Sequence, residues 1–115
     1  MKLILAVIQP TKLDAVQQAL AAIGVTRLTV VDAMGFARQR GHAETYRGHE
    51  YETHLLRKVE LQIAVNDDYV EPTLACLEEH ARTSKHGHIG DGKAMVLPIH
   101  DAMQISDGLT GPSAI

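Results

Sequence analysis

The fold is decided by the stretch Val59-Glu60-Leu61-Gln62-Ile63-Ala64-Val65, in which every second residue is a large aliphatic one. This period of two is typical of a β-strand that has one face in a core and the other face more polar. The residues that follow, Asn66-Asp67-Asp68, are suited to cap a helix. We therefore predict a half-buried strand that leads directly into a helix.

The predicted helix follows this cap. Pro72 is compatible with it because a proline in the first turn removes no backbone hydrogen bond. Cys76 lies inside the helix, and we interpret it as a small core residue rather than a nucleophile. The core-facing stripe would consist of Val70, Leu74, Leu77 and Ala81.

The N-terminal part of the chain shows a similar pattern. Residues 3–8 form a short apolar run that suits a strand buried on both faces. Thr11 and Asp14 resemble a capping box at the start of a helix, and Gly24 stands where the helix would end. The core stripe of this helix would be Leu13, Val16 and Leu20.

Two further strands complete the domain. Residues 25–36 are rich in β-branched side chains, and residues 93–99 read as a last strand at a sheet edge, because Pro98 lacks an N–H group. The order βαββαβ predicts a ferredoxin-like α+β sandwich with both helices on one face of the sheet. We expect a single domain over residues 1–115, and a neighbouring subunit would cover the other face.

A long polar insert, residues 37–57, separates the second and third strands. It holds arginines, glycines and two of the three tyrosines, and it shows no strand or helix pattern. Compact domains rarely keep about twenty such residues unless the segment binds a partner or is modified. We therefore predict a long functional loop.

Composition excludes several classes of function. The 115 residues carry a formal charge of −3, with 11 basic against 14 acidic residues, which argues against binding to nucleic acid. A single cysteine cannot form an intrachain disulfide, and no apolar run is long enough to cross a bilayer. No serine lies on a recognisable nucleophile turn. We expect a cytoplasmic protein, without direct membrane insertion, that is not an enzyme.

A second informative loop, residues 83–93, ends in Ile89-Gly90-Asp91-Gly92-Lys93. Glycines let main-chain N–H groups approach an anion closely, and lysine supplies positive charge for a phosphate. The alternative is a plain turn before a strand, for which Asp-Gly is common. It is not a Walker A loop, because the required spacing and the following helix are both missing.

The same loop contains His86-Gly87-His88, with two of the 7 histidines of the chain. Their spacing suits zinc or another transition metal, but a metal site needs a third or fourth ligand. The alternative is a pair of solvated histidines with some pH sensitivity. A metal-binding or metal-responsive module is therefore our second functional hypothesis.

Both loops resemble those of the P-II nitrogen-regulatory signal-transduction family. The T-loop signature of this family is close to Tyr-Arg-Gly-small-Glu-Tyr, which corresponds here to residues 46–51 with a histidine at the small position. Its phosphate loop, Thr-Gly-Lys-Ile-Gly-Asp-Gly-Lys, corresponds to residues 83–93 with three residues inserted. The resemblance extends over essentially the whole chain.

The resemblance implies a homotrimeric regulator that binds adenine nucleotide (ADP, AMP or ATP) between subunits. Its 37–57 loop would grip a membrane transporter or a metabolic enzyme, in nitrogen or related metabolism. The implied nucleotide contacts are Thr29, Gly35, Arg38, Gly90, Asp91, Gly92 and Lys93. The implied 2-oxoglutarate contacts are Gln39 and Lys58, with magnesium near Gln39, and the implied uridylylation site is Tyr51.

Some positions depart from the family pattern. The two late arginines that reach the terminal phosphate of ATP in the family correspond here to Gln104 and Ser106, which carry no fixed positive charge. Ala37 stands where the family usually has glycine. These differences predict a divergent member in which ADP or AMP binds at least as well as ATP.

Overall fold

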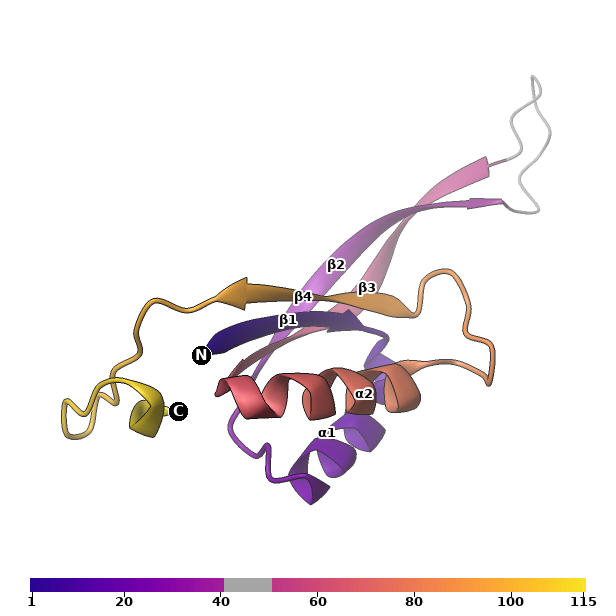
Figure 1. Cartoon of the computed structure of the whole chain (residues 1–115). Coiled ribbons are helices and arrows are strands. Elements are labelled where there is room, and N and C mark those ends of the chain that lie inside the picture. Colours follow the sequence, from indigo (N-terminus) through magenta and orange to yellow (C-terminus); the bar gives the residue numbers. More distant parts are fainter. Residues whose placement is uncertain (41–50) are drawn as a thin grey trace.

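The computed structural model describes residues 1–40 and 51–115, and for residues 36–40 and 51–54 it describes the backbone alone. Within these ranges two helices pack on one face of a four-stranded antiparallel sheet (Figure 1). The elements are β1 (Lys2–Ile8), α1 (Leu13–Ala22), β2 (Thr29–Arg40), β3 (Tyr51–Val65), α2 (Val70–Ala81) and β4 (Gly92–Pro98). The predicted βαββαβ order and the ferredoxin-like α+β architecture are confirmed.

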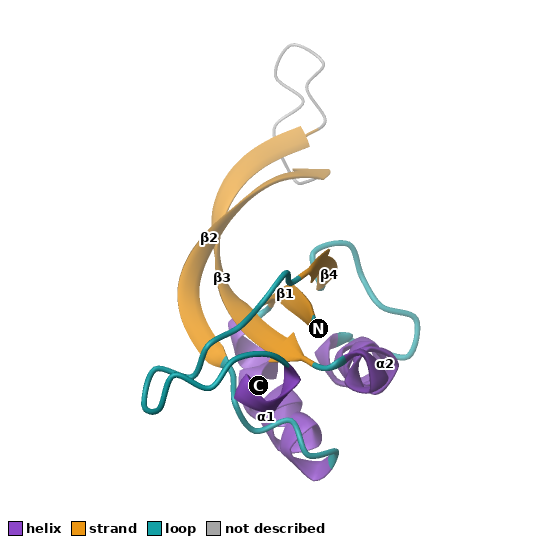
Figure 2. Cartoon of the chain, turned by 60° about the vertical axis from the view of Figure 1, so that its left-hand side comes forward, coloured by secondary structure: helices purple, strands orange, loops and turns teal. Residues whose placement is uncertain are grey.

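The strand order in the sheet is β2-β3-β1-β4. Every neighbouring pair is antiparallel, and Ile4 near the start of β1 lies opposite both Ile63 and Val96. Since β4 ends the order, Pro98 lies on an edge strand of the described sheet, as predicted. Figure 2 shows both helices on the same side of the strands.

The core lies between the helices and the two central strands. The alternation predicted for residues 59–65 is confirmed, because all four aliphatic side chains on that face are at most 4% exposed. They meet alternate residues of β1 and two fully buried side chains of α1, Val16 and Leu20. Burial of such aliphatic side chains contributes roughly 1.5–3 kcal/mol each, so this layer supplies most of the stability of the fold.

α2 departs in part from its predicted stripe. Its buried residues are Thr73, Cys76, Leu77 and Ala81, with Val70 and Leu74 partly buried beside them. Thr73 is fully buried but was not predicted, because its hydroxyl makes it look like a surface residue in sequence. Cys76 is a core residue as expected, and burial raises the pKa of its thiol. No helix in the described ranges is long and apolar enough to cross a membrane.

The helix starts differ from the predicted caps. One turn of 3₁₀ helix precedes each α-helix, so α1 begins at Leu13 and α2 at Val70. Neither Thr11 nor Asn66 makes a side-chain capping hydrogen bond. Asn66 instead donates from its amide to the main-chain oxygen of Pro112, at 3.2 Å. Thr11 and Asn66 therefore stand near the helix starts, as predicted, but they do not act as side-chain caps.

The end of α1 explains why the second strand starts later than predicted. Gly24 has a φ of 90° and donates to Ala21, and Val25 donates to Leu20 at 2.9 Å. These two bonds form a Schellman motif, which uses a hydrophobic residue directly after the glycine. Val25 is therefore buried as part of the helix stop, and β2 begins only at Thr29.

The insert at residues 37–57 is the largest correction. β2 continues to Arg40 and β3 begins at Tyr51, so residues 37–40 and 51–57 of the predicted loop form a two-stranded ribbon, and residues 41–50 lie outside the described part. Figure 1 shows this ribbon extending well beyond the helices. Its strands pair through main-chain groups and have no core to face, so no alternation of apolar residues is required. A polar sequence can therefore hide a strand of this kind.

Candidate functional site

The loop between α2 and β4, residues 82–91, is organised around the carboxylate of Asp91. Oδ2 accepts hydrogen bonds from the main-chain N–H groups of Thr83 (3.0 Å) and His88 (2.8 Å), and Oδ1 accepts one from the Thr83 hydroxyl. The N–H groups of Thr83 and His88 stabilise the charged form and lower the pKa of Asp91. The nucleotide contact predicted at Asp91 therefore falls on a side chain whose two oxygens bind within its own loop.

Two side chains from the sheet hold this loop at Gly90. Lys58 of β3 donates from Nζ to the main-chain oxygen of Gly90. Gln9, just after β1, donates from Nε2 to the same oxygen at 3.4 Å and lies 3.5 Å from Oδ1 of Asp91. Gln9 was not predicted from sequence, since a lone glutamine beside a proline belongs to no motif.

The two glycines of the predicted phosphate loop have different roles. Gly92 has a φ of 116°, and a Cβ there would lie 1.8 Å from the main-chain oxygen of Val7. Only glycine fits at this point, because β4 comes into register with β1. Gly90 also has a positive φ, of 101°, but no other described residue outside its immediate neighbours comes within 4 Å of its Cβ position. The space beside the Cα of Gly90 is thus open, while its carbonyl oxygen is held by Lys58 and Gln9.

The strand register shows which face of the sheet carries the predicted lysines. Alternate residues of β1, starting at Ile4, are buried beneath the helices, so Val7 points to the opposite face. Val7 pairs with Glu60 on one side and Lys93 on the other, and directly opposite residues share a face. Lys58, two residues before Glu60, lies on this helix-free face as well.

Gly35 and Thr29 of β2 also lie on the helix-free face, but in different places. A Cβ on Gly35 would be 3.1 Å from Cγ of Lys58, so Gly35 is directly beside that lysine. Thr29 pairs with Gln62 and is three strand spacings from β4, about 14 Å. One chain therefore brings Gly35, Lys58 and loop 82–91 together, whereas Thr29 stays apart from them.

The remaining predicted residues, at the outer end of the ribbon, are placed by their backbone. Arg38 pairs with Thr53, Gln39 with Glu52, and Tyr51 with Arg40. The side chains of Arg38, Gln39 and Tyr51 lie outside the described part of the chain. Their predicted roles in binding nucleotide, 2-oxoglutarate or magnesium, and in uridylylation, stay predictions.

His86 and His88 are both exposed in loop 82–91. Over the described ranges, no three His, Cys, Asp or Glu side chains are grouped closely enough to hold a metal ion. The nearest acidic side chain that bonds to this segment is Asp91, and its carboxylate is already engaged by N–H and O–H donors. The structure therefore gives the predicted metal site no support.

Gln104 and Ser106 lie in the segment after β4, where their side chains bond to each other. Nε2 of Gln104 donates to Oγ of Ser106 at 3.1 Å and to Oδ2 of Asp107 at 3.3 Å. The main chain of Gln104 also accepts from Gly108 and donates to Leu109. Gln104 and Ser106 therefore belong to a compact turn that contains the acidic side chain of Asp107 and no basic side chain.

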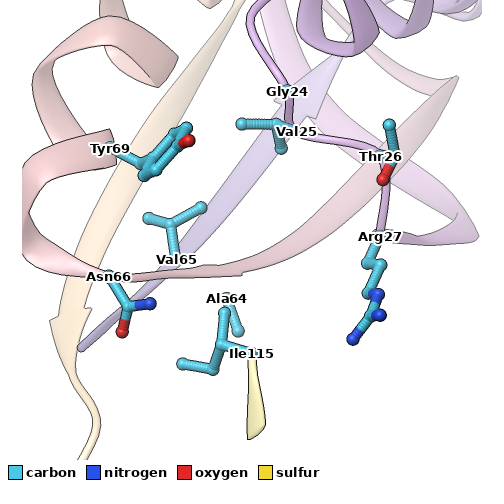
Figure 3. A pocket seen from close by; sticks show the side chains of 9 residues that line it. All are labelled: Gly24, Val25, Thr26, Arg27, Ala64, Val65, Asn66, Tyr69 and Ile115. Atoms are coloured by element: carbon cyan, nitrogen blue, oxygen red, sulfur yellow. The ribbon is translucent and has the colours of Figure 1, made fainter. Parts of the chain in front are cut away.

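A hollow of about 320 Å³ lies at the far end of the sheet from loop 82–91 (Figure 3). Figure 3 shows the Tyr69 ring and Val65 on one side and the Arg27 side chain on the other, with Val25 and Ala64 between them. The lining residues are Gly24, Val25, Thr26, Arg27, Ala64, Val65, Asn66, Tyr69 and Ile115. Sequence reasoning missed this hollow, because it is built from four separate segments and no motif connects them. Its Arg27 stands two residues before Thr29.

Comparison with known proteins agrees on one family. The sequence profile described as "Nitrogen regulatory protein P-II" matches residues 1–108. The chain is 44% identical over 115 residues to nitrogen regulatory protein GlnK1 of Methanosarcina mazei, which covers all of this chain and 97% of that protein. It is 46% identical to a nitrogen regulatory protein P-II of Bradyrhizobium diazoefficiens, with both chains fully covered. The solved structure of B. subtilis GlnK superposes with a TM-score of 0.80 at 30% identity, covering 99% of this chain and 97% of that one.

Proposed function

This chain belongs to the nitrogen regulatory protein P-II family, and we propose that it is a signal-transduction regulator of nitrogen or related metabolism. In this proposal, adenine nucleotide binds between the subunits of a homotrimer. Nucleotide binding shifts the conformation of residues 37–57, which contact a membrane transporter or a metabolic enzyme. This requires that nucleotide and partner discriminate between the same conformations. The protein acts by binding rather than by catalysis.

The observation that carries the proposal is the position of two lysines beside loop 82–91. Lys58 and Lys93 lie on the helix-free face at the same end of the sheet, and Lys58 bonds to Gly90. No other described residue outside its neighbours comes within 4 Å of the Cβ position of Gly90, which leaves room for an anion beside this part of the loop. Fixed positive charge beside an open glycine main chain is the chemistry that recognises phosphate.

The separation of Thr29 from this loop supports a site shared between subunits. In one chain Thr29 and Lys93 are separated by about 14 Å of sheet, which favours a site that takes Thr29 from a neighbouring copy. A neighbouring copy could supply Thr29, together with the hollow beside Arg27, to receive the base. The phosphates would then lie against loop 82–91 of the first copy.

The exposed apolar side chains of the sheet support a trimer. Val31, Met95 and Leu97 lie on the helix-free face and are 37%, 43% and 39% exposed. Large apolar patches on a free surface indicate contact with another protein. Three copies that turn these faces toward one axis would cover them, in a closed assembly of identical subunits.

The ribbon formed by β2 and β3 is the proposed partner arm. It carries apolar side chains away from the core, with Met34 58% and Leu55 60% exposed. These side chains flank the segment whose sequence resembles the T-loop. Tyr51, at the start of β3, is the proposed uridylylation site. Incubation with a uridylyltransferase should add mass to the native protein and not to Tyr51→Phe.

The proposed effector is 2-oxoglutarate, bound by Lys58 and Gln39 with magnesium near Gln39. Lys58 already donates to Gly90, so a carboxylate of the effector would compete with the loop for the same ammonium group. Magnesium prefers oxygen ligands, and the carboxylate of Asp91 is taken up by its own loop. The amide oxygen of Gln39 and the nucleotide phosphates would therefore have to supply its ligands.

Calorimetric titration of the full chain with ADP, ATP, AMP and zinc tests the proposal. We expect saturable binding of adenine nucleotide and none of zinc, because the described histidines lack further ligands. For substitutions of Lys58 or Lys93, Lys2→Met is a matched control, since Lys2 bonds to Asp67 at the other end of the sheet. Zinc binding without nucleotide binding would overturn the proposal and favour the metal-binding module.

A further inference from the structure

We propose that Asp91 is a positioning residue. Its carboxylate closes residues 83–91 into one loop through hydrogen bonds, an arrangement called the clasp below, and so fixes the backbone at Gly90. It does not contact the nucleotide or magnesium. This inference rests on the proposed nucleotide site and specifies how that site is held in shape. It differs from the interpretation of Asp91 as a ligand contact, which sequence alone suggested.

The hydrogen bonds of Asp91 account for the clasp. Three donors come from the loop itself: the N–H of Thr83, the hydroxyl of Thr83 and the N–H of His88, and Nε2 of Gln9 adds a longer bond from outside the loop at 3.5 Å. Thr83 stands eight positions before Asp91 and His88 three, so one carboxylate joins the start, the middle and the end of the loop. A carboxylate engaged by three donors is stabilised as an anion, and an anion beside phosphate would repel it. The oxygens of Asp91 therefore bind donors of the loop and not the ligand.

The clasp also explains how the loop accommodates His86-Gly87-His88. The N–H of His88 is one of the three donors, so the segment contributes directly to the closure. Gly87 has a φ of 73°, and a Cβ there would lie 3.4 Å from Oδ2 of Asp91 and 3.3 Å from Cγ of Arg82. The main chain therefore passes close over both side chains, while the imidazoles of His86 and His88 stay exposed.

Arg82 braces the same segment from α2. Its guanidinium donates to Glu78, one helical turn earlier, at 2.8 Å, and to the main-chain oxygen of Lys85 at 3.4 Å. Lys58 holds the other side of the loop at Gly90. With its outer turns fixed in this way, the loop depends on Asp91 for the closure between Thr83 and His88.

The test compares Asp91→Asn with Lys93→Ala in the full chain. An asparagine can keep one neutral oxygen against the two N–H donors, with its NH₂ group toward the Thr83 hydroxyl, but the negative charge that strengthens these bonds is lost, so the clasp would weaken. We expect Asp91→Asn to weaken ADP binding at least tenfold in calorimetry and to raise the hydrogen-exchange rate of the His88 amide at least tenfold. Lys93→Ala should weaken ADP binding and leave the His88 amide unchanged.

Three controls make the comparison specific. Exchange at the Leu61 and Ile63 amides, in the centre of the sheet, reports whether each variant is folded. Asp67→Asn makes the same chemical change at a carboxylate that accepts from the N-terminal ammonium group at 2.8 Å, far from loop 82–91, and it should alter neither readout. Thr83→Ser keeps both donors and should retain ADP affinity within about twofold.

The outcomes separate this inference from the proposed function. If Asp91→Asn lowers ADP affinity while the His88 amide is unchanged, Asp91 touches the ligand and the clasp is wrong. If the amide exchanges faster but ADP affinity is unchanged, Asp91 does not position the site. If the native protein binds no adenine nucleotide and Asp91→Asn still frees the His88 amide, the clasp stands and the proposed function fails.

Discussion

Lys58 on β3 donates a hydrogen bond from its Nζ to the main-chain oxygen of Gly90, 32 residues further along the chain. Lys58 belongs to the strand that continues into the exposed ribbon, and Gly90 belongs to the loop that precedes β4. One contact therefore links the proposed partner arm to the proposed phosphate loop. A ligand that breaks the hydrogen bond between Lys58 and Gly90 would therefore affect both the ribbon and loop 82–91.

The first prediction follows from this contact. Lys58→Met keeps the length of the side chain and removes its charge, so Gly90 loses its charged donor. A hydrogen bond to a charged group contributes roughly 1.5–3 kcal/mol, and partial exposure reduces this, so we expect ADP affinity to fall by about three- to tenfold. Calorimetry measures the change, and Lys2→Met serves as the control. Unchanged ADP affinity in Lys58→Met would show that the hydrogen bond between Lys58 and Gly90 has no part in binding.

Lys93→Ala should weaken nucleotide binding and leave the fold intact. The side chain of Lys93 is exposed on the helix-free face, so its removal leaves no cavity. The loss of one charged contact to a phosphate predicts a decrease of about tenfold or more in ADP affinity. Urea unfolding should change by less than about 0.5 kcal/mol, as for other surface substitutions. A large loss of stability would assign Lys93 a structural role instead.

Nucleotide preference is the sharpest prediction from the sequence. Gln104 and Ser106 bond to each other and, in the case of Gln104, to Asp107, so this turn brings no positive charge to a terminal phosphate. Two missing charged contacts of roughly 1.5–3 kcal/mol each would cost tenfold or much more in ATP affinity. We expect ADP or AMP to bind at least as well as ATP in calorimetry at pH 8. A preference for ATP above tenfold would refute the argument.

The oligomeric state gives an independent prediction. Because Val31, Met95 and Leu97 leave the helix-free face partly apolar, we expect a trimer at micromolar concentration in sedimentation equilibrium. Met95→Glu places a charge on this face and should shift the equilibrium toward smaller species. Met103→Glu, on the segment after β4, is the matched control at another exposed methionine. A monomer mass for the native chain contradicts the trimer.

Among the glycines of the loop, Gly92 should cause the largest loss of stability when it is replaced by alanine. Gly92→Ala combines a left-handed φ with a Cβ that overlaps the main-chain oxygen of Val7, so β4 would have to leave its register. We expect a loss of at least about 3 kcal/mol in the free energy of unfolding, measured in urea. Gly108→Ala also has a positive φ, of 74°, but open space around it, and it should cost only about 1 kcal/mol. Equal losses in the two variants would rule out the overlap.

The fold could be predicted where a buried face imposes a pattern. The alternation around Leu61 and the helical spacing of Val16 and Leu20 are visible because water is excluded from one side of each element. The outer halves of β2 and β3 have no such constraint, so the polar sequence beyond Gly35 gave no sign of strand. Thr73 was missed for a related reason, since burial depends on packing as well as on polarity.

The candidate site was predictable only as a set of residue types. The sequence pointed to Gly90, Asp91 and Gly92 as one loop, but it could not separate their roles, which depend on φ angles and on contacts with Val7 and Thr83. Gln9 and the hollow beside Arg27 depend on the approach of segments far apart in the chain. Such contacts follow from the register of the strands and leave no local motif.

β3 runs without interruption from Tyr51 to Val65, so a single strand belongs both to the ribbon and to the centre of the core. If that strand slid by one residue, its buried side chains from Val59 onward would turn to the solvent face and its outward ones into the core. A partner that pulls on the ribbon therefore cannot move it lengthwise without unfolding the sheet. Twisting and bending, which antiparallel ribbons tolerate, are the motions left to it. We therefore expect a partner on the ribbon to act on the end of the sheet where Lys58 meets Gly90 by twisting the strands and not by sliding them.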